Sequence, residues 1–260
     1  MNKKNYKPLI SIIICTNNSE ESIIENINSI KSQTYKNYEV VVVDNLSSDS
    51  TINIIKKKKF HKIKFVIEKD NGIYNAINKG IKISSGKIIS ILHSDDYYHD
   101  NNILNIITKS FAKNNVDLIY GNLIYVKKNN IKKKLRYWKS GKYIKNNFYK
   151  GWSPPHPTFI CKKSTYLKGG FYKENIGNAA DIELMHRYLA LLNFKYKYIN
   201  KTLITMRYGG TSNKNLKNII LQNFQILKFL NLNKNLIKVL VFFLYKIKAR
   251  IKQFINSYAE

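Results

Sequence analysis

The sequence predicts an α/β fold in which a mostly parallel sheet is flanked by helices, and two observations support this prediction. In the first 120 residues, apolar segments without polar alternation are separated by segments whose isoleucines recur at helical spacing. Uninterrupted apolar strands are typical of a parallel sheet that helices cover on both faces. Polar or acidic residues also follow each of the first four apolar segments, where sheets of this kind collect their ligands.

Five buried strands and three helices account for this alternation. The strands are expected at residues 9–15, 38–44, 63–68, 87–92 and 117–122. Apolar residues three or four positions apart share one face of a helix, and this spacing predicts helices at residues 19–33, 47–58 and 72–84. The first two helical segments begin with serine, which favours a helix N-terminus.

The pattern changes after Asn122, and three of the four prolines fall within residues 151–157. Proline fixes its own backbone angle, so these residues predict a rigid loop. The other elements expected here are two strands around an Asn-Asn turn within 121–143, a short strand at 158–161, a helix at 179–192, paired strands at 195–210 and a basic helical tail at 216–259.

The chain carries a large positive charge, with 45 Lys and Arg against 16 Asp and Glu in 260 residues, a formal net charge of +29. Such a surface favours anionic partners, such as nucleic acid, anionic lipid headgroups or phosphorylated substrates. A general enrichment in Lys, Asn and Ile is an equally good source of this charge, so the charge does not identify the partner. Because carboxylates are scarce in this chain, the places where they cluster are informative.

Cys15 and Cys161 are the only cysteines, which suggests a reduced, cytoplasmic protein. The N-terminal apolar segment is too short for a signal peptide, and no segment approaches the roughly 18 apolar residues that cross a bilayer. Residues 234–254 have an apolar centre flanked by Lys and Arg, which favours a helix in the headgroup plane of an anionic membrane. We expect peripheral attachment to the inner face of the plasma membrane, with packing of this apolar face on the domain as the alternative.

Two adjacent carboxylates, Asp95 and Asp96, follow the strand expected at 87–92. A carboxylate pair at a strand end commonly binds a divalent cation, and Mg²⁺ or Mn²⁺ takes its other ligands from phosphate oxygens and water. Such a cation offsets the charge that develops on a leaving diphosphate. Asp44 and Asp70 follow two other expected strands. The alternative for all three strand-end aspartates is that they cap helices.

Several segments together resemble the family 2 glycosyltransferases, which have the GT-A (Rossmann-like) fold. They are "SIIICTNN", "YEVVVVDNLSSDST", "EKDNGIYNAINKG", "ILHSDD" and "NAADIELMHRYL", found in this order within residues 8–215. The resemblance implies one domain at 1–215, with a nucleotide-binding part at about 1–122 and an acceptor-side part at about 123–215. A basic amphipathic tail would follow at 216–260. The branch that these segments indicate makes bacterial cell-surface polysaccharide of the O-antigen type.

The resemblance implies roles for polar residues near the strand ends. Asp96 is the expected ligand of Mg²⁺ or Mn²⁺, and Asp95 is the expected contact to sugar or ribose. Asp44 is expected to accept the ring N–H of uracil. His156 is expected beside the acceptor or the diphosphate, with a structural role as the alternative. The full set of expected donor-binding residues is Thr16, Asn18, Asp44, Asp70, Asn71, Asn75, Lys79, Asp95 and His156.

Transfer to an acceptor hydroxyl also needs a general base, because the pKa of the hydroxyl lies far above neutral pH. The resemblance places this carboxylate at Asp181, near the start of the helix expected at 179–192, and Glu183 is the alternative base. Asp181 could also be an acidic first-turn residue that interacts with the helix dipole. One base and no separate nucleophile predict in-line displacement with inversion, which the family also implies.

We therefore expect an inverting glycosyltransferase that uses a nucleotide-diphosphate sugar, by default a UDP-hexose or UDP-N-acetylhexosamine. The acceptor would be a hydroxyl of a glycan or of a lipid-linked saccharide. A nucleic-acid-binding protein is the alternative that the net charge offers, but it leaves Asp44, Asp96 and Asp181 without a role, so no nucleic-acid partner is expected. A sugar nucleotidyltransferase would need a glycine-rich phosphate loop, and residues 15–21 contain no glycine.

Overall fold

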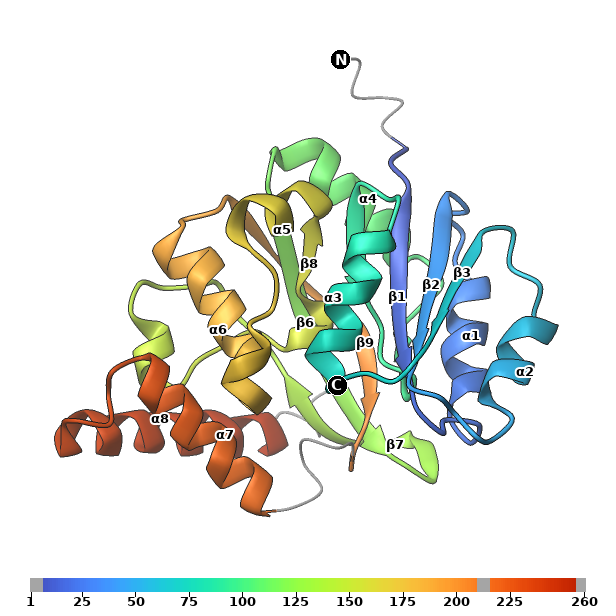
Figure 1. The fold of residues 1–260 in the computed structure, drawn as a ribbon. Helices are drawn as coiled ribbons and strands as arrows, with labels where there is room; N and C mark the ends of the chain where they lie inside the picture. The colour runs from blue at the N-terminus through green and yellow to red at the C-terminus, as the bar shows by residue number, and fades with distance from the viewer. Residues whose placement is uncertain (1–6, 210–215, 256–260) are drawn as a thin grey trace.

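A computed structural model of the chain describes residues 7–209 and 216–255 and confirms the α/β fold. One nine-stranded sheet has the order β3-β2-β1-β4-β8-β6-β9-β5, with β7 paired to β6 (Figure 1). Strands β1, β2, β3 and β4 are parallel to one another, and β9 is parallel to β6. Strand β8 is antiparallel to β4 and β6, β7 is antiparallel to β6, and β5 is antiparallel to β9. The strands are β1 (Ile10–Thr16), β2 (Tyr38–Asp44), β3 (Ile63–Ile67), β4 (Ile88–Ile91), β5 (Asp96–Tyr98), β6 (Leu118–Lys127), β7 (Asn130–Trp138), β8 (Ile160–Lys162) and β9 (Tyr196–Arg207).

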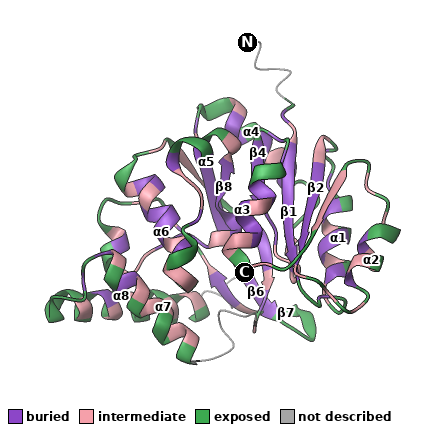
Figure 2. Ribbon diagram, viewed as in Figure 1, coloured by how far each residue is buried: buried purple, intermediate pink, exposed green. Residues whose placement is uncertain are grey.

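Helices cover both faces of the sheet, and the buried residues of Figure 2 lie between them. On one face α1, α2 and α4 share a hydrophobic core with the sheet, and on the other face α3, α5, α6, α7 and α8 do so. The helices are α1 (Ile23–Lys31), α2 (Thr51–Lys57), α3 (Ile73–Ile83), α4 (Ile103–Asn114), α5 (Lys163–Gly169), α6 (Ala180–His186), α7 (Leu216–Phe229) and α8 (Leu236–Ile255), and shorter turns are η2 (Asn147–Lys150), η3 (His156–Thr158), η4 (Glu174–Ala179) and the π turn η5 (Arg187–Leu191).

The five strands and three helices predicted in the first half of the chain are confirmed to within a few residues. The predicted starts of α1 and α2 are each four residues too early, because the hydroxyls of the two serines have other partners. The Ser19 hydroxyl lies 2.9 Å from that of Ser94, and Ser47 donates its hydroxyl to Asp44. Helices α4 and α5 and strand β5 were not predicted.

The segment predicted as paired strands at 195–210 does not form a pair within residues 195–209, and residue 210 lies outside the described part. β9 is one strand that lies parallel to β6 and whose last residues also pair with β5. The polar residues near its middle mark an irregularity in the β6–β9 register, where a Cβ on Gly121 would lie 3.0 Å from the carbonyl oxygen of Lys201 and 2.5 Å from Leu203 Cγ. The long β6–β9 pair extends the sheet beyond the part that α1 and α2 cover, into the part formed by the second half of the chain (Figure 1).

The predicted helical tail consists of α7 and α8, and one side of it is buried on the domain. Ile226 and Leu227 of α7 and Phe242 of α8 belong to the same core as α6. Gly151, with φ of 70°, lets α8 come close, since a Cβ there would lie 3.0 Å from Lys246 Cβ. Packing on the domain therefore holds for one face of the tail, while residues 256–260 lie outside the described part.

Candidate active site

The ends of β1 and β2 are joined through Asp44, which is fully buried. Its Oδ1 accepts hydrogen bonds from Thr16 Oγ1 (2.6 Å) and Ser47 Oγ (2.5 Å), and its Oδ2 accepts one from the Ser47 backbone N–H (2.7 Å). Thr16 and Asp44 are register partners in the parallel pair, so the sheet itself places them together. Helix α2 is preceded by Ser50 as its N-cap residue, so the capping alternative is wrong for Asp44.

Asn18 is exposed beside Asp44 and holds the loops after β1 and β2 together. It has a positive φ of 46°, which Asn tolerates better than most residues. Its backbone N–H donates to Ser47 Oγ (2.9 Å), and its Oδ1 accepts the backbone N–H of Ser48 (2.9 Å). The polar groups of Asn17, Asn18 and Ser48 face outward at this edge.

The end of β3 joins the same edge through Asn45, whose Oδ1 accepts the backbone N–H of Asp70 (3.0 Å). The Asp70 carboxylate accepts the N–H of Gly72 (2.9 Å) and closes the turn that leads into α3. This is a local structural use of Asp70, close to what the capping alternative predicted.

Three further predicted donor residues are Asn71, which precedes α3, and Asn75 and Lys79, which lie on it. Asn75 Oδ1 accepts the backbone N–H of Asn71 (3.3 Å), and its amide donates to Glu174 (3.0 Å). Lys79 forms an ion pair with Glu68 (2.8 Å). These side chains lie near the end of β3, and their contact with a donor stays a prediction.

Asp96 is the most unusual carboxyl group of the structure. Its side chain is fully buried, and neither carboxylate oxygen has a hydrogen-bond partner among the described residues. Burial raises its pKa well above the ordinary value, Asp95 adds to this rise, and Arg207 on β9 opposes it. Buried polar groups normally find a partner, so this carboxylate is suited to a cation. Asp96 begins a strand rather than a helix, so it is not a helix cap.

The loop that carries Asp95 and Asp96 is tied to the end of β1. Asn26 of α1 donates its amide to the backbone carbonyls of His93 and Asp96, both at 2.8 Å. The hydroxyls of Ser19 and Ser94 lie 2.9 Å apart. Among the residues described, no three His, Cys, Asp or Glu side chains converge as a metal cage, so a divalent cation here would also need oxygens from the diphosphate and water.

His156 lies beside this loop, with its ring 5.8 Å from that of His93. Its Nε2 lies 2.8 Å from Tyr172 Oη. Burial, with a smaller contribution from His93, lowers the pKa of His156 to about 3. The imidazole is therefore neutral at physiological pH and would act on a ligand through hydrogen bonds rather than through charge.

An aromatic wall leads from His156 to Asp181. Tyr172 stacks on Tyr74 of α3 with ring centroids 5.5 Å apart, and the hydroxyl of Tyr74 interacts with the Asp181 carboxyl group. Burial raises the pKa of Asp181 to about 6, while Lys246 of α8 lowers it. Tyr74 lies in a motif already singled out in the sequence, but nothing in the sequence indicated that Lys246 would reach this site.

The alternative base, Glu183, is buried and forms ion pairs with two cationic side chains. Its carboxylate accepts from Arg187 Nη2 (3.0 Å) and pairs with Lys173 Nζ (2.8 Å). The Asp181 carboxylate, at the first turn of the same helix, accepts the backbone N–H of Ile182 (2.8 Å). It is the partly exposed member of the two. The predicted residues are thus brought to one edge of the sheet, from Asp44 through Asp96 and His156 to Asp181.

The fold and this acidic edge define a GT-A-type α/β protein. The model of the family described as "Glycosyl transferase family 2" matches residues 11–167. The chain therefore belongs to this family of glycosyltransferases. This confirms the predicted enzyme class, a glycosyltransferase.

Two curated relatives illustrate the match. An uncharacterized glycosyltransferase of Methanocaldococcus jannaschii, MJ1057, is 30% identical over 217 residues, which cover 80% of this chain and 73% of the relative. The Escherichia coli protein WfgD, named UDP-Glc:alpha-D-GlcNAc-diphosphoundecaprenol beta-1,3-glucosyltransferase, is 36% identical over 124 residues, 47% of this chain and 49% of the relative. The chain spans only 18% of the length of another relative, an uncharacterized glycosyltransferase of Rickettsia bellii.

Solved structures share the fold. Staphylococcus aureus TarS in complex with UDP-GlcNAc superposes with a TM-score of 0.65 at 20% identity, over 84% of this chain and 66% of that one. The mannosyltransferase PcManGT of Pyrobaculum calidifontis, in complex with GDP-Man and Mn²⁺, superposes with a TM-score of 0.62 at 20% identity, over 86% and 65%. At this identity the likeness shows the GT-A architecture.

Proposed function

We propose that the protein is an inverting glycosyltransferase of cell-surface polysaccharide synthesis. It would move a hexose or N-acetylhexosamine from a UDP-linked donor to a hydroxyl of a lipid-linked saccharide or another glycan. The observation that carries this proposal is the buried Asp96 carboxylate, which has no hydrogen-bond partner among the described residues and follows a loop that Ser94 joins to the segment after β1. The name of the Escherichia coli relative supports the donor and acceptor classes.

On the donor side, Asp44 and Asn18 would have different roles. Thr16 and Ser47 occupy three of the roughly four acceptor positions of the Asp44 carboxylate. We therefore assign to Asp44 the positioning of this edge, and to the exposed Asn18 the direct contact with the nucleotide. The predicted contact between Asp44 and the uracil N–H would compete with the Ser47 hydroxyl.

Mg²⁺ or Mn²⁺ would be held by Asp96, with Asp95 beside it. When bound, such a cation offsets the negative charge that develops on the leaving diphosphate. The fit rests on the two unpartnered oxygens of Asp96, and the Mn²⁺ in PcManGT supports it. Asp95 would turn toward the sugar or ribose, and the neutral His156 would orient a sugar hydroxyl or a phosphate oxygen.

Asp181 would act as the general base. With a pKa of about 6 it is mostly ionised at neutral pH and still basic enough to accept the proton of an attacking hydroxyl. Glu183 cannot take this role without breaking its contacts to Arg187 and Lys173. Because one carboxylate serves as base and no second one is placed as a nucleophile, the anomeric centre would invert.

The chain would attach to the anionic inner face of the plasma membrane through α8. None of the described helices is long and apolar enough to cross a bilayer. Helix α8 has no acidic residue and five basic ones, Lys238, Lys246, Lys248, Arg250 and Lys252. Its exposed apolar residues include Leu236, Ile237, Leu240, Val241, Leu244, Tyr245, Ile247, Ile251, Phe254 and Ile255, and a basic helix with such a face suits an anionic lipid surface.

Release of UDP tests the proposed reaction. The purified protein would be incubated with UDP-glucose, UDP-galactose, UDP-GlcNAc or UDP-GalNAc and a GlcNAc-diphosphate-prenol acceptor, and both UDP and the extended acceptor would be measured. We expect one donor to give product with an inverted anomeric centre. No product from any donor, or a product with retained configuration, would refute the proposal.

A further inference from the structure

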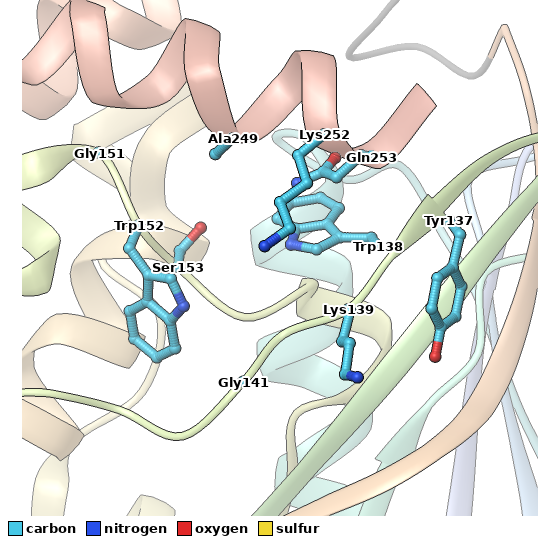
Figure 3. Close-up of a pocket in the computed structure, with 10 residues that line it drawn as sticks. All are labelled: Tyr137, Trp138, Lys139, Gly141, Gly151, Trp152, Ser153, Ala249, Lys252 and Gln253. Atoms are coloured by element: carbon cyan, nitrogen blue, oxygen red, sulfur yellow. The ribbon is translucent and has the colours of Figure 1, made fainter. Parts of the chain in front are cut away.

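A cavity of about 270 Å³ lies between the end of β7 and helix α8, away from the acidic edge. Figure 3 shows Trp138 and Lys139 on one side, Trp152 and Ser153 on the opposite side, and Lys252 entering from the helix above. None of the ten lining residues is acidic, and two are lysines. The cavity is therefore an aromatic and cationic one, suited to an anion that carries an apolar or sugar group.

Arg136 is a buried cation that contacts Trp138, one of the residues lining the cavity. The Arg136 guanidinium lies between the rings of Tyr125 (4.5 Å) and Trp138 (4.9 Å), and its Nε donates to Gln253 Oε1 of α8 (2.6 Å). None of the ion pairs within residues 7–209 and 216–255 includes Arg136. A buried cation without a carboxylate leaves an uncompensated positive field, which an anion in the adjoining cavity would offset.

The cavity shares part of its lining with a smaller one near the proposed base. This second cavity, of only about 10 Å³, is lined by Gly151, Trp152 and Ser153 as the first is, and also by Ile182 and Lys246. Ile182 directly follows Asp181, and the charge of Lys246 reaches the Asp181 carboxylate. Trp152 and Ser153 therefore connect the lining of the first cavity with residues next to Asp181, and a ligand anchored between β7 and α8 would reach Asp181 over their outer side.

We propose that this cavity binds the diphosphate of a prenyl-diphosphate-linked saccharide, the acceptor of the reaction. This inference rests on the proposed function and deepens it. Lys139 and Lys252 contact the phosphates, and the field of Arg136 favours them. The sugar lies along Trp152 toward Asp181, and the prenyl chain leaves beside Ile247 and Ile251, which are exposed on α8.

The donor diphosphate has a different place. None of the residues predicted to bind it lines the cavity. Two separate diphosphate sites match a reaction that brings together a nucleotide-diphosphate donor and a diphosphate-linked acceptor.

The chain offers a direct probe of this cavity, because its only two tryptophans, Trp138 and Trp152, both line it. Farnesyl diphosphate would be titrated into the protein without donor while tryptophan fluorescence is recorded, with farnesol and inorganic diphosphate as separate titrants. We expect a saturable change with farnesyl diphosphate, weaker binding of inorganic diphosphate and no comparable change with farnesol. Equal responses to farnesol and farnesyl diphosphate would refute a phosphate site. Equal affinity for inorganic and farnesyl diphosphate would refute a lipid-linked ligand.

The matched variants are K139Q/K252Q and K145Q/K248Q. Both pairs remove two exposed lysines, one from the segment after β7 and one from α8, but only the first pair lines the cavity. We expect roughly tenfold weaker farnesyl diphosphate binding, or a larger loss, in K139Q/K252Q only. Equal effects of the two pairs, or none, would overturn the assignment of the cavity.

The same variants separate this inference from the proposed function. K139Q/K252Q should raise the KM for a diphosphate-linked acceptor while the KM for the UDP-sugar and the turnover of a phosphate-free GlcNAc glycoside stay unchanged. If the fluorescence results hold but no donor supports transfer, the cavity assignment stands and the proposed reaction fails. If transfer occurs with equal KM values in both variants, the reaction stands and the cavity assignment fails.

Discussion

At the residue scale, the same residue type takes different roles because its surroundings differ. Asp44 is satisfied by Thr16 and Ser47, Asp96 has no partner among the described residues, and Asp181 interacts with Tyr74 and Lys246. These three environments suit a positioning group, a cation ligand and a proton acceptor in turn. The roles follow from hydrogen bonds and desolvation, which a list of aspartates in a sequence does not contain.

The Asp181 assignment predicts a defined pH dependence. Because the base must be ionised, kcat should rise with pH through about 6 and then level off. Lys246 lowers the pKa of Asp181, so Lys246→Met should move this limb to higher pH. Asp181→Asn should keep the donor KM and lose about 10²- to 10⁴-fold in kcat. Initial rates measured from about pH 5 to 9 would test the wild-type profile and both variants. An Asp181→Asn variant with near-normal kcat would show that Asp181 is not the base.

The Asp96 assignment predicts metal-dependent stabilisation. In the presence of UDP, Mn²⁺ or Mg²⁺ should raise the Tm of the wild-type protein, because a ligand that binds only the folded state stabilises it. Asp96→Asn should remove this increase and the transferase activity together, since the amide lacks the negative charge. Differential scanning fluorimetry with and without EDTA measures the shift. A metal-induced Tm increase that survives in Asp96→Asn would place the cation elsewhere.

At the element scale, α8 uses its two faces differently. Phe242 and Lys246 face the domain, where the ammonium group of Lys246 donates to Asn223 of α7 (2.5 Å). Leu244 and Ile247, one or two positions away, are exposed. A helical period of 3.6 residues separates these faces, so a single apolar segment can both hold the helix on the domain and meet a lipid surface.

Vesicle binding tests the exposed face. The protein should sediment with vesicles that contain phosphatidylglycerol but not with phosphatidylcholine vesicles, and salt should weaken the binding because it screens the basic residues. Leu244→Ser combined with Ile247→Ser should reduce binding at least about tenfold, while catalysis on a soluble acceptor stays intact. Equal partition of variant and wild-type protein would show that this face does not contact lipid.

At the scale of the whole molecule, the second half of the chain is built around the first. Strand β8 inserts antiparallel between β4 and β6, and β9 returns along β6 to pair with β5, the strand that Asp96 begins. Helix α8 then packs against the segments after β7 and reaches Asp181 through Lys246. The site is therefore assembled from segments more than 200 positions apart, between Thr16 and Lys246.

Phe242 tests whether the tail belongs to the domain. It is fully buried in the core shared with α6, so Phe242→Ala should cost about 3–5 kcal/mol of the free energy of unfolding. Leu244→Ala, on the exposed face, should change it by about 0.5 kcal/mol or less. Chemical denaturation followed by circular dichroism measures both. If Phe242→Ala leaves the main transition unchanged, the tail is an independent appendage.

The sequence by itself determined the alternating strands and helices, the covered parallel sheet and the acidic strand ends. These features follow from local periodicity and from the rule that parallel strands present their carboxyl ends at one edge. It also indicated Asp96 and Asp181, through motifs whose residues are neighbours in the chain. Local sequence patterns gave a wrong prediction at β9, where the polar residues at a register irregularity were interpreted as a turn between two strands. They were also wrong for the serines expected to start α1 and α2.

Only the tertiary structure decided which polar groups are satisfied and which are not. Among the described residues it left Asp96 without a hydrogen-bond partner, and it paired Glu183 with Arg187 and Lys173. It also formed the cationic cavity between β7 and α8, which shares lining residues with the surroundings of Ile182 and Lys246. The physical reason is that desolvation and hydrogen bonding depend on groups far apart in the chain. Periodicity places a side chain on a face, but only the packed fold sets its neighbours.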